Sequence, residues 1–77
     1  MDEYTTTDIG VSAALLTLGI HLLRVEKEDT KIVFVFEGSE EVTRIEQDFY
    51  TGLMVPAREY NDSIRAVKSH ISSLRKY

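Results

Sequence analysis

The segment Lys31–Glu37 constrains the fold of this chain more than any other part of it. A strand places successive side chains on opposite faces of its sheet. Both faces of this strand would be apolar, with Ile32, Phe34 and Phe36 on one side and Val33 and Val35 on the other. The pattern therefore predicts a central strand that is covered on both faces. A chain of 77 residues has room for one domain, residues 1–77, so both faces of this strand would have to be covered within that domain or by a partner.

The segment Ile9–Leu18 is predicted to form a helix that is apolar nearly all round. Thr7 or Asp8 can cap its first turn, and Gly19 stands where a helix-ending glycine is common. A helix without a polar face is buried on more than one side. Because a chain of this size has a limited core, the pattern suggests that a partner or a second copy covers part of the helix.

The remaining elements follow from capping signals and periodicity. Ser39 can cap a second helix that Gly52 ends, and Pro56 suits the first turn of a third helix. The third helix has an apolar stripe at steps of four and three residues, formed by Tyr60, Ile64, Val67, Ile71 and Leu74. Further strands are predicted over Glu3–Thr6, over His21–Glu28 with a hairpin turn at Asp29-Thr30, and over Leu53–Val55.

The predicted order is β-α-β-β-α-β with an added C-terminal helix, an α+β fold in two layers. This order matches the ferredoxin-like arrangement. Because the first and last strands have only three or four residues, a reduced three-stranded version of that arrangement is the alternative. The first two helices would cover one face of the sheet. The third helix could cover the other face or dock elsewhere.

The absence of cysteine excludes disulfide frameworks, thiol nucleophiles and zinc sites built on cysteine. Small extracellular domains usually depend on such cross-links, and the acidic start Met1–Tyr4 lacks the pattern of a secretory signal. The longest apolar stretch, Val11–Leu23, is interrupted by polar residues and is too short to span a bilayer. We therefore expect a cytoplasmic protein without membrane contact.

Titratable residues form no recognisable catalytic or metal-binding pattern. His21 and His70 have no second ligand at helical spacing. Two pairs of carboxylates, Glu40 with Glu41 and Glu46 with Asp48, fit the exposed surface of a helix. No nucleophile elbow, phosphate-binding loop or dinucleotide fingerprint is present. We expect no enzymatic activity, no cofactor and no metal.

Two aromatic side chains on a central strand can also stack RNA bases. Phe34 and Phe36 could serve in this way, but Lys31–Gly38 does not follow the pattern of RNA-recognition motifs. The nearby glutamates would also repel phosphates. Packing in the core is the favoured interpretation of both rings.

Charge is distributed unevenly along the chain. Residues 1–56 carry 4 basic and 11 acidic side chains, whereas residues 57–77 carry 5 basic and 2 acidic ones. The cations of the third helix flank and oppose its apolar stripe, and they are Arg58, Arg65, Lys68, Arg75 and Lys76. Such a face is either solvated or in contact with nucleic acid or with acidic protein partners.

Several strings of the chain together resemble a family of small bacterial and phage proteins described as a domain of unknown function. They are Thr6-Thr7-Asp8, Ala13-Ala14-Leu15-Leu16 with Gly19, Val25-Glu26, Phe34-Val35-Phe36-Glu37, Asp48-Phe49-Tyr50 with Gly52, and Val55-Pro56-Ala57-Arg58 with Tyr60. The resemblance spans nearly the whole chain and implies a prokaryotic or mobile-element origin. It implies no activity and no functional residue.

Three functions are compatible with these observations. The favoured one is a small non-enzymatic protein-interaction module of prokaryotic or phage origin, which forms a homodimer or binds a larger protein. In a phage, that larger protein could be a host defence complex that the module inhibits. The second function is a nucleic-acid-binding accessory protein that uses the basic face of the C-terminal helix. The third is an oligomer that sequesters a small ligand.

Overall fold

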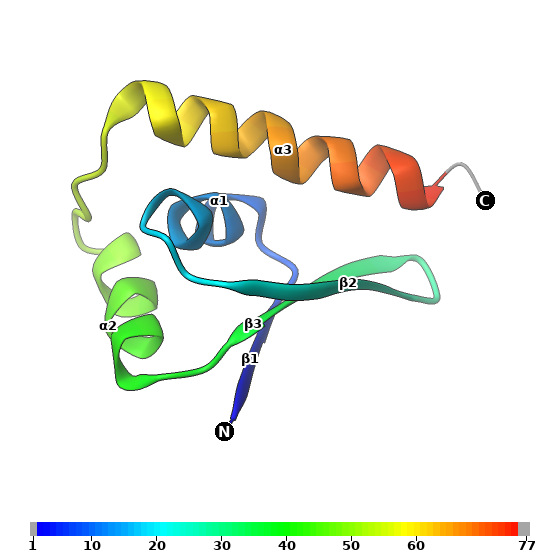
Figure 1. Cartoon of the computed structure of the whole chain (residues 1–77), viewed down its shortest axis with the longest axis horizontal. Helices are drawn as coiled ribbons and strands as arrows, with labels where there is room; N and C mark the ends of the chain where they lie inside the picture. The colour runs from blue at the N-terminus through cyan, green and yellow to red at the C-terminus, as the bar shows by residue number, and fades with distance from the viewer. Residues whose placement is uncertain (1, 76–77) are drawn as a thin grey trace.

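The computed structural model describes residues 2–75. The elements of this part of the chain are β1 (Glu3–Thr6), α1 (Ile9–Thr17), β2 (Leu22–Glu28), β3 (Lys31–Glu37), α2 (Glu40–Phe49) and α3 (Ala57–Arg75) (Figure 1). The α+β class is confirmed. So is the reduced three-stranded version of the predicted order, with α3 as the added C-terminal helix.

β3 is the central strand of the sheet, as its two apolar faces predict. The strand order is β1-β3-β2, and both pairings are antiparallel. The hairpin turn between β2 and β3 lies at Asp29-Thr30, where Asp29 takes the left-handed φ of 57° that glycine usually supplies in such turns. A bulge between Leu22 and Arg24 shifts the pairing of β2 with β3.

The predicted strand at Leu53–Val55 is wrong. Residues 53–56 have no regular secondary structure. The amide of Leu53 donates a hydrogen bond to the carbonyl of Asp48 at 2.8 Å, so it completes the end of α2 and is not free to pair with a strand. Gly52 turns the chain with a φ of 114°. The segment then connects α2 to α3 along the side of the molecule (Figure 1).

All three helices lie on the same side of the sheet (Figure 1). α1 packs between the sheet and α3, and α2 lies against α1. The sequence left open whether the third helix covers the opposite face of the sheet. It does not, because α3 packs on α1 and its His70 ring contacts Phe34 on the inner face of the sheet.

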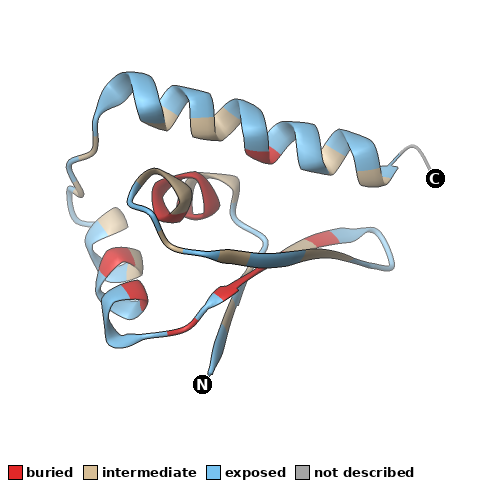
Figure 2. Ribbon diagram, viewed as in Figure 1, coloured by how far each residue is buried: buried red, intermediate tan, exposed pale blue. Residues whose placement is uncertain are grey.

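The apolar surface of α1 is covered within the chain. The carboxylate of Asp8 caps the helix by accepting a hydrogen bond from the amide of Val11 at 2.9 Å, and Gly19 follows the helix with a φ of 83°. Residues 11–15 are all buried (Figure 2). Since the sheet, α2 and α3 together enclose α1, its composition no longer argues for a partner.

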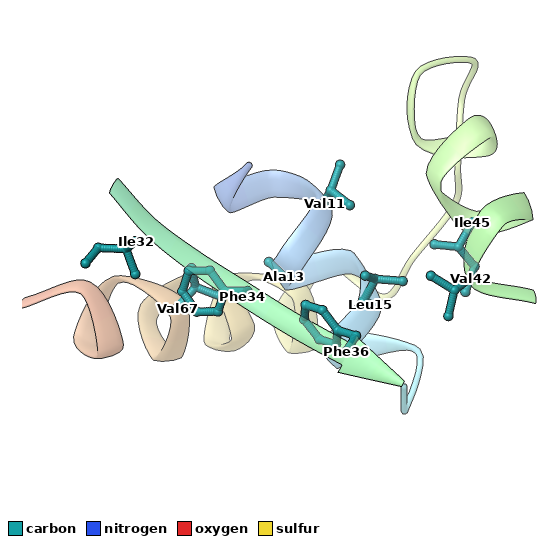
Figure 3. Packing of buried hydrophobic residues seen from close by; sticks show 9 residues of the cluster. All are labelled: Val11, Ala13, Leu15, Ile32, Phe34, Phe36, Val42, Ile45 and Val67. Atoms are coloured by element: carbon teal, nitrogen blue, oxygen red, sulfur yellow. The ribbon is translucent and has the colours of Figure 1, made fainter. Parts of the chain in front are cut away.

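One cluster of buried apolar side chains connects the sheet with the three helices (Figure 3). Its members are Val11, Ala13, Leu15, Ile32, Phe34, Phe36, Val42, Ile45 and Val67. The predicted stripe of α3 is confirmed, because Val67 is fully buried and the other four stripe residues pack against the cluster. The core therefore lies entirely on the helical side of the sheet.

Candidate interaction surfaces

The side of the sheet that faces away from the helices is the first candidate surface. We call it the outer sheet face. The strand register places on it the apolar side chains of Val33 and Val35 and the hydroxyl of Thr5. It also carries six charged side chains, which are Glu3, Arg24, Glu26, Glu28, Lys31 and Glu37. No helix of the described chain covers this face (Figure 1).

An arginine bridge crosses the outer sheet face. The guanidinium of Arg24 on β2 binds both carboxylate oxygens of Glu3 on β1, at 2.8 and 2.9 Å. It also binds a carboxylate oxygen of Glu26 at 2.5 Å. Because β3 lies between β1 and β2, the Arg24 side chain must pass over the central strand. Val35 pairs directly with Arg24 and is 0% exposed, although no helix lies on its side of the sheet.

The bridge also sets the electrostatics of this face. Hydrogen bonding to Arg24 is the main cause that holds the pKa of the Glu3 carboxyl below its ordinary value. Two of the four glutamates of the face are therefore engaged by Arg24, whereas Glu28 and Glu37 are not among its partners. With four carboxylates against two cations, the outer sheet face is acidic.

The exposed side of α3 is the second candidate surface. Arg58, Arg65, Lys68 and Arg75 are all exposed. At 3.6 residues per turn they fall within an arc of about 100° and extend over about 25 Å of the helix axis. Glu59 and Asp62, the acidic residues of α3, lie outside this arc. We call the four cations the basic stripe.

The basic stripe contains four of the five cations that the sequence predicts for the basic face of the C-terminal helix. The fifth, Lys76, lies outside the described residues. Within residues 2–75, the only ion pairs are those of Arg24, so no carboxylate lies within 4.0 Å of a stripe cation. The stripe therefore presents its full charge to solvent or to a partner.

The two candidate surfaces lie on different parts of the molecule. α3 packs on α1 and, through its His70 ring, against Phe34 on the inner face of the sheet. Arg58 and Arg65 lie near the side of α3 opposite its buried stripe, whereas Lys68 and Arg75 flank that stripe. In Figure 1 the sheet lies below α1, and α3 forms the upper edge of the molecule. The outer sheet face is thus acidic, and one flank of α3 is basic.

The other residues considered from the sequence form no site among the described residues. Phe34 and Phe36 are both 0% exposed, so packing in the core is confirmed and base stacking on them is excluded. The His70 ring packs edge-on against Phe34 with 6.2 Å between centroids. Between residues 2 and 75, no three histidine, aspartate or glutamate side chains lie close enough together to hold a metal ion. Glu40, Glu41 and Asp48 are exposed.

A group of tyrosines and carboxylates surrounds the start of α1. Burial and the neighbouring Glu46 carboxylate raise the pKa of Tyr4. Burial and Asp8 likewise raise the pKa values of Tyr50 and Tyr60. The Tyr60 hydroxyl donates a hydrogen bond to the carbonyl of Gly10 at 3.3 Å. The Tyr60 hydrogen bond ties α3 to α1, and the raised pKa values leave the phenols protonated at neutral pH.

Arg24 is the one candidate residue that sequence reasoning missed. The spacing of Arg24 and Glu26 by two residues in a strand would have placed them on one face. Glu3 could not have been identified as the second partner, because it is 21 residues away and its position depends on the register of β1. The bridge is a consequence of the sheet order.

The described part of the chain contains no helix long and apolar enough to cross a membrane. A family model described as "Domain of unknown function (DUF5659)" matches residues 1–73. No curated protein and no solved structure matches the chain significantly. The match agrees with the resemblance found in the sequence as far as the unknown function is concerned, whereas a bacterial or phage origin stays a prediction.

Proposed function

We propose that this protein, which belongs to the DUF5659 family, is a non-enzymatic protein-interaction module that self-associates through its outer sheet face. One observation carries the proposal. No helix of residues 2–75 covers one whole side of the three-stranded sheet, and β3, the most apolar strand, runs through its middle. Sheets that pack on only one face offer the other face to solvent or to another protein.

The chemistry of this face supports a polar contact over a hydrophobic one. Val35 is already covered, Val33 is half-buried, and charged side chains surround both of them. Contiguous apolar patches mark obligate interfaces, and the outer sheet face has none of that kind. Its acidic character favours a partner surface that carries cations.

Light scattering over a range of protein concentrations at low salt tests this proposal. We expect the apparent mass to rise with concentration for the natural sequence and to stay monomeric for Glu26→Lys/Glu28→Lys, which changes the outer sheet face. The matched control is Glu40→Lys/Glu41→Lys, which makes the same change of net charge on exposed positions of α2. A natural protein that is monomeric at every concentration would refute the proposal.

A second candidate function is binding of nucleic acid through the basic stripe. It is supported by the four unpaired cations of the stripe, which lie within one arc of an exposed helix. Four phosphate contacts would make the affinity fall roughly 100-fold between 50 and 200 mM salt. A gel-shift assay at low salt compares the natural protein with Arg65→Glu/Lys68→Glu and with the control Lys27→Glu/Arg44→Glu. Equal binding by all three proteins would exclude a role of the stripe.

The finer expectations drawn from the sequence stay predictions. The family description gives neither a phage origin nor inhibition of a host defence complex. Sequestration of a small ligand likewise has no support from the surface of the described residues. A hollow between β1 and the start of α2, for example, is lined mainly by acidic and hydroxyl side chains, among them Asp2, Glu3, Ser39 and Glu40.

A further inference from the structure

The self-association proposed above leaves open which surface of the second copy meets the outer sheet face. Three arrangements use the two candidate surfaces. Two outer sheet faces can meet, two basic stripes can meet, or the stripe of one copy can meet the sheet of the next. The charges on the two surfaces distinguish these arrangements.

The two symmetric arrangements are disfavoured by like charges. A twofold dimer brings the same patch of both copies together. If two outer sheet faces met, the excess carboxylates of one copy, Glu28 and Glu37, would lie against a second acidic surface. If two basic stripes met, four cations would face four cations. Like-charge contacts across an interface cost several kcal/mol.

The third arrangement joins opposite charges, and the dimensions of the two surfaces agree. The basic stripe extends over about 25 Å of the axis of α3. The seven residues of β2 and of β3 extend over about 23 Å. Glu28 lies at one end of the outer sheet face and Glu37 at the other, so carboxylates are available along most of the length of the stripe.

A single molecule cannot make this contact with itself. The basic stripe lies along one flank of α3, on the helical side of the sheet, and the outer sheet face lies on the other side of the sheet. A second copy can make it. Each added copy then presents a new free surface at both ends, so the contact is head-to-tail and does not close on itself unless its rotation forms a ring.

We propose that the basic stripe of α3 in one copy docks on the outer sheet face of the next copy, so that this protein assembles head-to-tail. The inference rests on the proposed self-association and specifies its geometry. Three strands about 4.8 Å apart give the outer sheet face a flat area of roughly 300 Å². Stable interfaces bury about 800 Å² per partner. Each contact is therefore weak, and assembly depends on protein concentration and on salt.

Two charge-reversed variants test the inference. Arg65→Glu/Lys68→Glu reverses the middle of the basic stripe, and Glu26→Lys/Glu28→Lys reverses one end of the outer sheet face. The sheet variant carries two basic surfaces, and the stripe variant presents two glutamates and no net positive charge to an acidic sheet face. We therefore expect each to be monomeric at concentrations at which the natural protein assembles. In an equimolar mixture the two glutamates in the stripe of one variant face the basic sheet of the other, and assembly is expected to return.

Matched controls separate the stripe from net charge. Lys27→Glu/Arg44→Glu gives the same net charge as the stripe variant but changes exposed cations on β2 and α2, and we expect it to assemble like the natural protein. Circular dichroism confirms that each variant is folded before its mass is measured. Raising the salt from about 20 to about 500 mM, where the Debye length falls to a few ångströms, is expected to dissolve the assemblies.

The outcomes distinguish this inference from the proposed function. If the natural protein assembles but the stripe variant assembles equally well, the head-to-tail contact is refuted and self-association stands. If each variant is monomeric but their mixture stays monomeric too, the head-to-tail contact is refuted as well. If the natural protein never exceeds the monomer mass, both are refuted.

Discussion

The two faces of β3 are alike in sequence and different in the structure. On the inner face, Phe34 and Phe36 are sealed by three helices. On the outer face, Val35 is equally inaccessible, yet its cover is the side chain of Arg24 held between two glutamates. Hydrophobic alternation therefore reveals which residues are shielded from water. It does not reveal whether helices or charged side chains shield them.

This difference decides where a partner can act. The inner face is closed by packing that cannot open without unfolding the chain. The outer face is closed by side chains that remain about half exposed and can move individually. A contact with another molecule is therefore compatible with the outer face and not with the inner one.

The largest effect is expected on the inner face. Phe34→Ala removes a ring that is 0% exposed and should cost about 3–5 kcal/mol of the free energy of unfolding. A chain of this length has about 4–12 kcal/mol in total, so the variant should be partly or wholly unfolded at 25 °C. Urea denaturation followed by circular dichroism measures the loss. A stable variant with a loss below about 1 kcal/mol would contradict the position of this ring at the centre of the core.

A matched pair of substitutions on the same strand compares the two faces directly. Ile32→Thr places a hydroxyl on the inner face and should cost about 2–3 kcal/mol, because the hydroxyl lacks a partner there. Val35→Thr should cost about 1 kcal/mol or less, since its hydroxyl can reach water or the nearby carboxylates. Urea denaturation of both variants gives the comparison. Equal losses would show that the outer face is as dry as the inner one.

The tyrosine group around α1 predicts an alkaline transition. Because the folded protein raises the pKa of Tyr4, the folded state favours the protonated phenol. This contribution to stability is complete below the ordinary tyrosine pKa of about 10 and is lost as the pH rises through the higher folded value. Thermal unfolding between pH 8 and 12 should show a smaller loss for Tyr4→Phe than for the natural protein. An identical alkaline loss would show that Tyr4 does not contribute.

The smallest effect on stability is expected for the bridge itself. Arg24→Met keeps an apolar stem over Val35 but removes the partners of Glu3 and Glu26. Ion pairs on a surface contribute little and are screened by salt, so the melting temperature should fall slightly at low salt and not at all at high salt. Because Arg24 lowers the pKa of Glu3, the contribution exists above the ordinary glutamate pKa and is lost as the pH falls through the lower folded value. A large loss independent of salt would mean that Arg24 acts mainly by packing.

Local signals predicted much of the fold. Capping by Asp8 and Ser39, the glycines after α1 and α2, and the periodic stripe of α3 depend on neighbouring residues, and the structure confirms them. The error at Leu53–Val55 was also local in origin. A short apolar run is compatible with a strand and with a loop. The hydrogen bond from the Leu53 amide to the Asp48 carbonyl makes this segment a loop between α2 and α3.

Long-range arrangement could not be predicted in the same way. The apolar α1 was compatible with a second copy or with a covering helix, and only the placement of α3 settles the question. The basic stripe was visible from spacing alone. The acidic outer sheet face required the strand register and the knowledge that no helix of the described residues covers that side.

A dilution series of amide NMR spectra at low salt tests the central claim most directly, because it reports every residue at once. The account predicts concentration-dependent shifts at outward-facing residues of β2 and β3, such as Glu26 and Val33, and at Arg65 and Lys68 of α3. Buried residues of α1, such as Ala14, should not respond. Spectra that do not change with concentration, or changes confined to residues outside the outer sheet face and the basic stripe, would contradict it.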